Sequence, residues 1–131
     1  MNKSVSAKDF MATNLVTFHP DMDIMEAVRL LLQHRISGAP VVDLLGNLVG
    51  MLSEKDCLKV ALDAGYHGDW GGRVDEYMNP EVQTIDADTS ILDVARSFIE
   101  GRYRRYPVMK ENRLVGQISR RDVLRALQTL M

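Results

Sequence analysis

Two four-residue segments place a hydroxyl and a carboxylate at the predicted start of a helix. They are Ser53-Glu54-Lys55-Asp56 and Ser119-Arg120-Arg121-Asp122. The first turn of a helix presents free N–H groups and the positive end of the helix dipole to an anion, and a carboxylate offers two acceptor oxygens. The segments are therefore candidate ligand sites. The alternative is that the serines are only N-caps and the aspartates only first-turn charges.

The two segments belong to an internal repeat. At an offset of 67 positions Asp21 matches Asp88 and Pro40-Val41 matches Pro107-Val108. After a one-residue deletion the offset is 66, and Leu48-Val49-Gly50 matches Leu114-Val115-Gly116. About 14 identities fall in about 49 aligned positions, mainly at turn, cap and polar residues, as expected for a duplicated chain.

Each half predicts a helix near its beginning. Asp23 and Ser90 are capping residues that stand three positions ahead of the carboxylates of Glu26 and Asp93. Apolar residues follow at helical spacing, so each helix should bury one face. These residues are Ile24, Ala27, Val28 and Leu31 in the first half and Ile91, Val94, Ala95 and Phe98 in the second.

A hairpin and a second helix complete each half. Pro40 and Pro107 are compatible with strand starts. Polar or glycine-containing turns at 43–47 and 110–113 lead into returning strands, and the last helices are expected to end near Ala64 and Leu130. With an early strand, each repeat has the order strand, helix, strand, strand, helix, which is an α+β fold with small mixed sheets.

The predicted organisation is a first repeat at 7–64, a linker at 65–73 and a second repeat at 74–131. The stretch from Gly65 to Gly72 is rich in glycine and is expected to be irregular. Because neither half is long enough for a comfortable core of its own, the two sheets should pack together about a pseudo-two-fold axis with helices outside. Clefts between the repeats are then the expected ligand sites.

Composition narrows the class of protein. The chain has 131 residues, 46% hydrophobic and 26% charged, which is typical of a globular domain. No apolar run is long enough to span a membrane and the start lacks the apolar region of a signal peptide, so a cytoplasmic location is expected. From Arg96 to Arg125 there are nine basic and three acidic residues. This asymmetry favours an anionic partner for the second half, while the net charge of −2 argues against nucleic acid.

The element order, with a hydrophobic-Gly-hydrophobic strand running into Ser-x-x-Asp twice in register, resembles the cystathionine-β-synthase (CBS) domain. The resemblance covers nearly the whole chain, from about Ala7 to Leu130, and implies a tandem CBS-domain pair, often called a Bateman module. Such pairs bind adenosine-containing ligands, namely AMP, ADP, ATP, S-adenosylmethionine or NAD, between the repeats. They also associate into disc-like homodimers.

The resemblance assigns roles to the two segments. Asp56 and Asp122 would each accept hydrogen bonds from both ribose hydroxyls, and Ser53 and Ser119 would contact phosphate or ribose at positions where the family more often has Thr. Thr17 and Thr84 match the early-strand position near the base.

The loops that frame the adenine in the family differ between the two halves. The first has the small residues Gly38, Ala39 and Pro40, which would let a base approach the backbone. The second has Arg104, Arg105, Tyr106 and Pro107, with Arg121 beside Asp122. Guanidinium groups suit phosphate and aromatic rings suit a base. The alternatives are a solvated basic turn with Tyr106 in the core, or arginines that fill the second cleft, leaving one occupied site per chain.

Catalytic patterns are missing from the sequence. It has no glycine-rich phosphate loop, its three histidines lack metal-ligand spacing, and its single cysteine, Cys57, lies in an apolar-periodic stretch where a core residue is expected. We therefore expect no enzyme activity, no required cofactor and no metal. The predicted function is a regulatory module that binds an adenosine nucleotide and signals to an unidentified effector protein. A structural dimerisation module without a ligand is the alternative.

Overall fold

The computed structural model describes residues 5–68 and 70–131, except for the His67 side chain. Asp69 and residues 1–4, on which parts of the linker and leader predictions fall, lie outside the described residues. The chain packs as two compact units. We call residues 16–82 the first-repeat unit, and residues 5–15 together with 83–131 the second-repeat unit.

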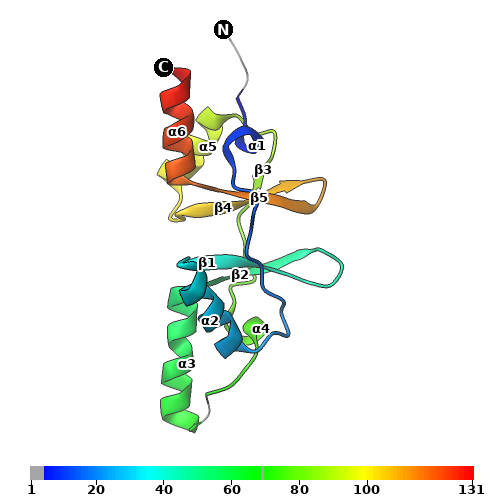
Figure 1. Cartoon of the computed structure of the whole chain (residues 1–131), viewed down its shortest axis with the longest axis vertical. Helices are drawn as coiled ribbons and strands as arrows, with labels where there is room; N and C mark the ends of the chain where they lie inside the picture. Colours follow the sequence, from blue (N-terminus) through cyan, green and yellow to red (C-terminus); the bar gives the residue numbers. More distant parts are fainter. Residues whose placement is uncertain (1–4, 69) are drawn as a thin grey trace. The chain divides into compact units, whose positions relative to one another are not determined.

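The first-repeat unit contains a two-stranded antiparallel sheet and three helices (Figure 1). Its elements are α2 (Ile24–His34), β1 (Gly38–Val42), β2 (Leu48–Ser53), α3 (Glu54–His67) and α4 (Val74–Tyr77). The predicted cap of α2 is confirmed, since the Asp23 side chain accepts a hydrogen bond from the Met25 N–H. One face of α2 is buried through Ile24, Ala27 and Leu31, as the apolar spacing predicts.

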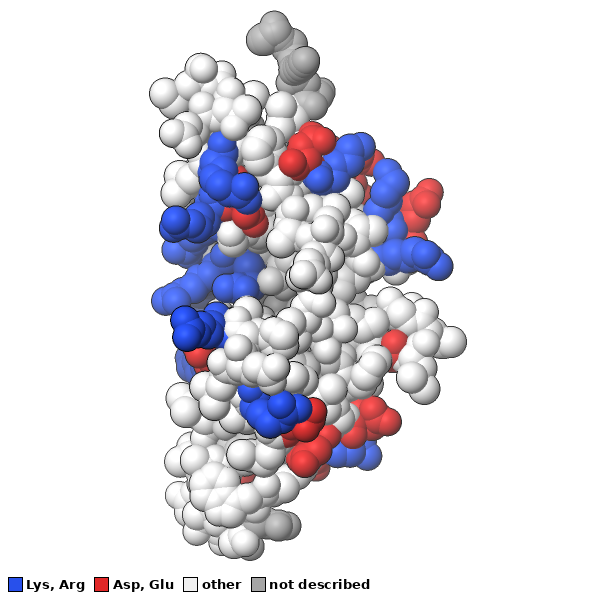
Figure 2. Space-filling view, in the orientation of Figure 1, with Lys and Arg blue, Asp and Glu red and all other residues white. Residues whose placement is uncertain are grey.

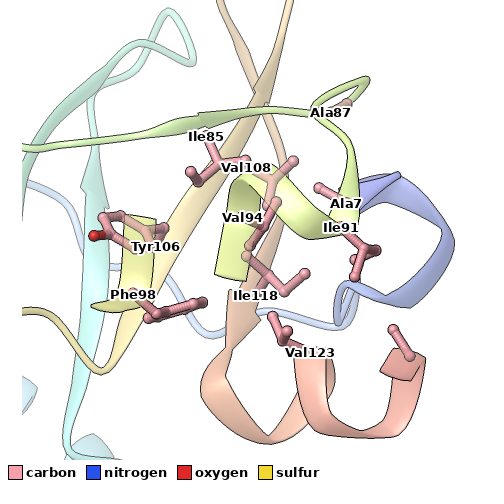
Figure 3. Packing of buried hydrophobic residues seen from close by; sticks show 11 residues of the cluster. Ala7, Ile85, Ala87, Ile91, Val94, Phe98, Tyr106, Val108, Ile118 and Val123 are labelled. Atoms are coloured by element: carbon pink, nitrogen blue, oxygen red, sulfur yellow. The ribbon is translucent and has the colours of Figure 1, made fainter. Parts of the chain in front are cut away.

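The second-repeat unit contains a three-stranded mixed sheet and three helices. Its elements are α1 (Ala7–Phe10), β3 (Ile85–Asp86), α5 (Ile91–Glu100), β4 (Arg105–Lys110), β5 (Arg113–Ser119) and α6 (Arg120–Leu130). β3 pairs parallel with β4, which pairs antiparallel with β5. Figure 3 shows its core, where side chains of α5 and α6 meet Val108 and Ile118 of the sheet.

The early strand expected in each repeat forms fully only in the second. Phe18 makes a single parallel bridge with Val41 in the first repeat. In the second repeat the Ala87 N–H extends the pairing by donating to the Met109 carbonyl at 2.8 Å. Pro20 is the equivalent of Ala87, and a proline has no N–H to donate.

The two leading helices are exchanged between the sequence repeats. α1 packs in the second-repeat unit and α4 in the first-repeat unit. Ala12 forms a backbone pair with Gln117 of β5, and Asn79 forms one with Met51 of β2. Sequence reasoning predicted neither short helix nor the exchange. Each compact unit therefore combines most of one sequence repeat with the leading segment of the other.

Two sequence-based boundaries need correction. α3 does not end near Ala64 but continues through Gly65 to His67, so the glycine-rich stretch is not irregular throughout. Gly68 ends the helix in a left-handed conformation, with φ 72°, and its N–H donates to the Ala64 carbonyl at 2.8 Å. In addition, β1 and β4 each begin two residues before the proline. None of the described helices, within residues 5–68 and 70–131, is long and apolar enough to cross a membrane.

Candidate functional site

The start of α3 is closed by a reciprocal capping arrangement. The Asp56 N–H donates to Ser53 Oγ at 3.2 Å, while Asp56 Oδ2 accepts from the Ser53 N–H and from Ser53 Oγ, both at 3.0 Å. The other carboxylate oxygen, Oδ1, lies 3.8 Å from Lys59 Nζ. Ser53 and Asp56 therefore do cap the helix. The cap uses only one of the two carboxylate oxygens of Asp56.

The start of α6 repeats this arrangement almost unchanged. The Asp122 N–H donates to Ser119 Oγ at 3.2 Å, and Asp122 Oδ2 accepts from the Ser119 N–H at 2.9 Å. Here Arg125 approaches more closely, with its Nη2 2.5 Å from Asp122 Oδ1. The Asp122 side chain keeps 15% of its accessible surface and that of Asp56 keeps 18%. Both carboxylates can therefore still be reached from solvent.

Basic side chains gather at the start of α6 (Figure 2). Arg105 in β4 is the register partner of Ser119 in β5, and the Arg120 N–H donates to the Arg104 carbonyl at 3.4 Å. Arg104 and Arg121 are exposed, and Arg105 is half-buried. Over residues 5–68 and 70–131, the guanidinium groups of these three arginines form no hydrogen bond or ion pair. This end of the second-repeat unit can offer three free guanidinium groups to an anion.

The start of α3 has the equivalent strand register and backbone hydrogen bond, with smaller and less basic side chains. Gly38 is the register partner of Ser53, and the Glu54 N–H donates to the Ser37 carbonyl at 2.9 Å. A Cβ on Gly38 would lie 2.9 Å from the Leu52 carbonyl oxygen, so only glycine fits there without movement. Lys55 stands where the second repeat has Arg121. The structure thus brings Gly38, Ser53 and Asp56 together, as the sequence predicts, but without an arginine.

The remaining predicted ligand residues lie along the adjoining strands. Ala39 and Pro40 in β1 and Pro107 in β4 are buried. Thr17 is half-buried and Thr84 is exposed, and each comes just before its repeat's early strand position.

Tyr106 lies in the core of the second-repeat unit. Only 2% of the residue is exposed, its ring lies 4.8 Å from that of Phe98, and its hydroxyl donates to the Ser97 carbonyl at 2.9 Å. Burial raises the pKa of the Tyr106 hydroxyl. The accessible ring of this loop is instead Tyr103, which is 39% exposed and 5.6 Å from Tyr106. Tyr103 is thus the ring available for stacking on a base.

Sequence reasoning missed the cations that face the two aspartates. Lys59 and Arg125 occupy equivalent positions, three residues after Asp56 and Asp122. Because residues three apart on a helix are neighbours, this spacing was a usable signal.

Neither a metal-holding cluster nor an activated thiol is found in the part of the chain that the structure describes. There, no group of three or more His, Cys, Asp or Glu side chains is placed to hold a metal ion. Burial raises the pKa of the Cys57 thiol to about 11, so the thiol is protonated at neutral pH and is a poor nucleophile. What the site offers is hydrogen-bond acceptors and positive charge.

Comparison with known proteins identifies the repeats. The family model described as CBS domain matches residues 7–63 and again 74–129. Protein MJ1225 of Methanocaldococcus jannaschii is 31% identical over 120 residues, which cover 92% of this chain but 42% of that relative. The chain thus spans less than half of MJ1225.

Two solved structures share the fold over nearly the whole chain. CBSX2 of Arabidopsis thaliana, crystallised in complex with AMP, has a TM-score of 0.83 and 28% identity, covering 95% of this chain and 97% of its own. The CBS domain pair of MJ0100, in complex with 5′-methylthioadenosine and S-adenosyl-L-methionine, has a TM-score of 0.79 and 27% identity. It covers 98% of this chain and 100% of its own.

Proposed function

Because the chain belongs to the CBS domain family, we propose that it is a regulatory module that binds an adenosine-containing nucleotide and signals the bound state to an effector protein. The observation that carries the proposal is the pair of matched capping arrangements, each with one carboxylate oxygen outside the cap. CBSX2 with AMP and MJ0100 with S-adenosyl-L-methionine support the choice of an adenosine ligand.

The capping geometry suggests how ribose would be held. Oδ2 of Asp56 and of Asp122 stays in its cap, while Oδ1, with two lone pairs, accepts hydrogen bonds from the ribose hydroxyls. At Asp122 the ribose must displace Arg125, whose guanidinium group is then available for a phosphate. At Asp56 the competing Lys59 is farther away, so less has to be displaced.

The three free arginines suggest where phosphate would be held. Arg104, Arg105 and Arg121 surround the start of α6, where the helix dipole adds to their positive charge. Charge-assisted hydrogen bonds contribute about 1.5–3 kcal/mol each. AMP, ADP and ATP are therefore the preferred ligands at the second repeat. Transmission to the effector requires that the nucleotide bind one conformation more tightly than another.

Calorimetric titration of AMP, ADP, ATP, S-adenosylmethionine and NAD into the full chain tests the proposal. Asp122→Asn and Asp56→Asn each remove one acceptor charge and keep an oxygen for the cap. Each should weaken binding at its own site about tenfold, which is about 1.4 kcal/mol. Asp93→Asn is the matched control, because Asp93 holds the same position in the first turn of α5 and pairs with Arg96 at 2.9 Å. Absence of binding by all five ligands, or an equal loss in the control, would contradict nucleotide sensing.

A homodimer is a second feature of the proposal, carried by exposed apolar side chains that occur at matched positions in both repeats. The pairs, with exposed fractions, are Met25 and Leu92 (38% and 67%), Leu32 and Ile99 (71% and 83%), and Leu58 and Leu124 (68% and 64%). They lie on α2 and α3 in one unit and on α5 and α6 in the other. Exposed apolar faces of this kind mark protein interfaces.

Sedimentation velocity measures this association directly. Leu58→Glu combined with Leu124→Glu should convert a dimer to a monomer, while Leu44→Glu, which alters an exposed leucine outside these helices, should leave the dimer intact. A wild-type chain that sediments as a monomer at high micromolar concentration would remove dimerisation from the proposal. A nucleotide-free dimer that binds none of the five ligands would favour the structural dimerisation module.

A further inference from the structure

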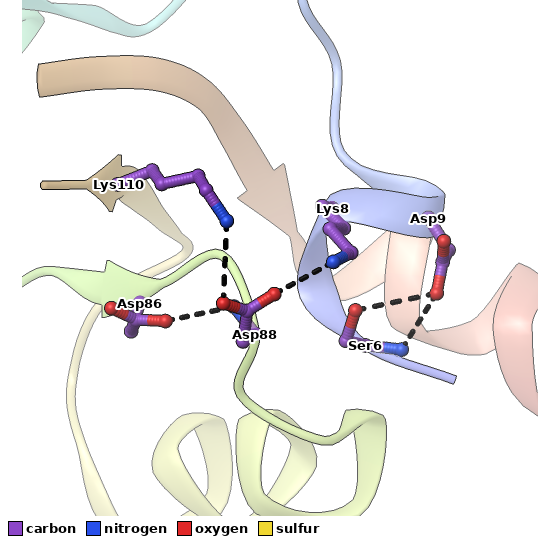
Figure 4. Close-up of polar contacts among 6 residues, drawn as sticks. All are labelled: Ser6, Lys8, Asp9, Asp86, Asp88 and Lys110. Carbon is purple, nitrogen blue, oxygen red and sulfur yellow. Dashed lines mark hydrogen bonds and ion pairs between the residues drawn. The ribbon is translucent and has the colours of Figure 1, made fainter. Parts of the chain in front are cut away.

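The second-repeat unit contains an ion network that joins two lysines through one aspartate (Figure 4). Lys8 Nζ lies 2.7 Å from Asp88 Oδ1, and Lys110 Nζ lies 3.4 Å from Asp88 Oδ2. The hydrogen bond from Lys8 and the charge of Lys110 lower the pKa of the Asp88 carboxyl. One carboxylate at this place in the repeat therefore binds two ammonium groups.

The first-repeat unit has the same backbone at the equivalent place. The Lys8 N–H donates to the Ala87 carbonyl at 3.0 Å, and the Asp75 N–H donates to the Pro20 carbonyl at 2.9 Å. Asp75 stands 67 positions after Lys8, and Ala87 stands 67 positions after Pro20, so the two hydrogen bonds join equivalent residues of the repeats. The hydrogen bonds therefore show that the exchanged segment crosses its unit in the same way in both repeats.

Two of the three side chains at this place have changed sign, while the third is aspartate in both repeats. Asp75 stands for Lys8, Asp21 for Asp88, and Asp43 for Lys110. Three carboxylates therefore replace one carboxylate and two ammonium groups.

Only one of the three carboxylates is neutralised by a cation within the described residues, 5–68 and 70–131. Arg73 binds Asp75 through Nη2 at 2.6 Å and Nε at 3.1 Å. The Asp43 carboxylate accepts from the Leu45 and Asn47 N–H groups at 2.9 Å and from the Asn47 side-chain amide at 3.2 Å, which lowers its pKa but supplies no charge. Asp21 is exposed. Asp21 and Asp43 therefore form no ion pair within these residues, although the charge of Asp21 helps to raise the pKa of the Arg73 guanidinium.

The three carboxylates line a groove of about 340 Å³ at the tip of the β1–β2 hairpin. Leu44 and Leu45 form its apolar side and are 92% and 87% exposed. The groove lies at the opposite end of β1 from Gly38, which is paired with Ser53. It is therefore separate from the proposed nucleotide site.

We propose that this groove binds a lysine side chain of a partner protein, with its ammonium group between Asp21 and Asp43 and a neighbouring apolar residue covering Leu44 and Leu45. The Lys8–Asp88–Lys110 network shows the interaction that the repeat makes at this place when lysine is present. The first-repeat unit, with eleven acidic and five basic residues in 16–82, complements a basic partner. A bare metal ion fits less well, because no group of three or more His, Cys, Asp or Glu side chains among the described residues is placed to hold one.

The acetylated and amidated peptide Leu-Lys-Leu is a suitable probe. Titrated into the full chain and followed by amide NMR, it should shift the resonances of residues 19, 21, 43–47 and 75 and saturate. The same peptide with acetyl-lysine should bind about tenfold more weakly, because it keeps the apolar contacts and loses the charge.

Two variants of the chain locate the interaction. Asp21→Lys supplies an internal ammonium group to Asp43 and should weaken peptide binding about tenfold or more, with the fold intact because Asp21 is exposed. Asp43→Asn keeps an acceptor oxygen for the turn and should weaken binding several-fold. Glu81→Lys makes the charge change of Asp21→Lys at an exposed site outside the groove and should leave peptide binding unchanged.

Each contrary result overturns the proposal in a distinct way. Equal weakening in Glu81→Lys would show only general charge attraction. Spermidine binding as tightly as the peptide, with no loss in Leu44→Ser, would assign the groove to a polyamine. A fall in sedimenting mass on Asp21→Lys would assign it to a second copy of the chain. No saturable shift with the peptide would show that the groove binds no lysine segment.

Discussion

The starts of α3 and α6 have the same capping hydrogen bonds but differ in the charge of the side chains around them. In both, the aspartate N–H donates to the serine hydroxyl at 3.2 Å and the serine N–H returns a bond to the carboxylate. Five equivalent positions around each cap differ in charge. In the second repeat all five are arginine. In the first repeat their net charge is +1, because Glu54 offsets one of the two lysines. These positions are Ser37, Gly38, Glu54, Lys55 and Lys59 against Arg104, Arg105, Arg120, Arg121 and Arg125.

This comparison separates what builds the site from what selects its ligand. The cap depends on two backbone N–H groups and a short serine and is independent of the neighbouring charges. Ligand charge preference depends on the side chains around the cap. A duplicated fold can therefore keep two equivalent helix starts and give them different ligands.

The largest expected effect comes from making the second site resemble the first. Arg104→Ser combined with Arg105→Gly copies Ser37-Gly38 and should weaken ATP binding about a hundredfold, because two charge-assisted contacts are lost. Calorimetric titration measures the change. Arg113→Ser removes an exposed arginine of the same unit as a control. A similar loss in that control would mean that general positive charge, and not this pair, attracts the phosphates.

The exchanged segments provide a second comparison, at the glycine in the middle of each returning strand. A Cβ on Gly116 would meet Met11 Sδ and lie 2.8 Å from the Ala12 carbonyl oxygen, while one on Gly50 would lie 2.6 Å from Met78 Sδ and 3.0 Å from the Asn79 carbonyl oxygen. We expect Gly116→Ala to lower the free energy of unfolding by about 2 kcal/mol and Gly50→Ala by less.

Urea denaturation checks this order. Gly65→Ala is the control, because a Cβ there has no neighbour within 4 Å and the site is helical. It should stabilise the chain by up to about 1 kcal/mol. A Gly116→Ala variant as stable as the wild type would contradict the close contact of Gly116 with Met11 and Ala12.

The two serine caps should contribute equally to the free energy of unfolding, even though the charges around them differ. Ser53→Ala and Ser119→Ala should each lower the free energy of unfolding by about 1 kcal/mol. Ser97→Ala, where the hydroxyl bonds to a carbonyl within α5, should change it by less than about 0.5 kcal/mol. Thermal and urea unfolding give the comparison, and a clear inequality between the two caps would show that the arginines also stabilise the helix start.

The smallest effect concerns the lysine–aspartate network. Its bonds to lysine lower the pKa of Asp88 in the folded chain, so their contribution is present above the ordinary aspartate pKa and is lost as the pH falls through the lowered value. Asp88→Asn should therefore flatten the loss of stability below about pH 4. Lys8→Gln should do the same, measured by thermal unfolding from pH 2 to pH 6. An unchanged acid profile in both variants would contradict the role of this network.

Much of the secondary structure could be predicted because its causes are local. Asp23 and Ser90 each cap a helix, and the apolar spacing identifies the buried faces of α2 and α5. The capping residues Ser53 and Ser119 are equally local signals. The candidate site was partly predictable for the same reason, since each serine and its aspartate are only three residues apart.

The sequence by itself determined the duplication, the α+β element order and the two helix starts, because periodicity, caps and turns act over a few residues. Only the tertiary structure decided that α1 and α4 exchange between the repeats, and that Gly50 and Gly116 lie under the exchanged segments. It also decided that Tyr106 is buried and Tyr103 accessible, and that Asp21, Asp43 and Asp75 line one groove. These features depend on contacts between residues far apart in the chain, and no local pattern encodes such a contact.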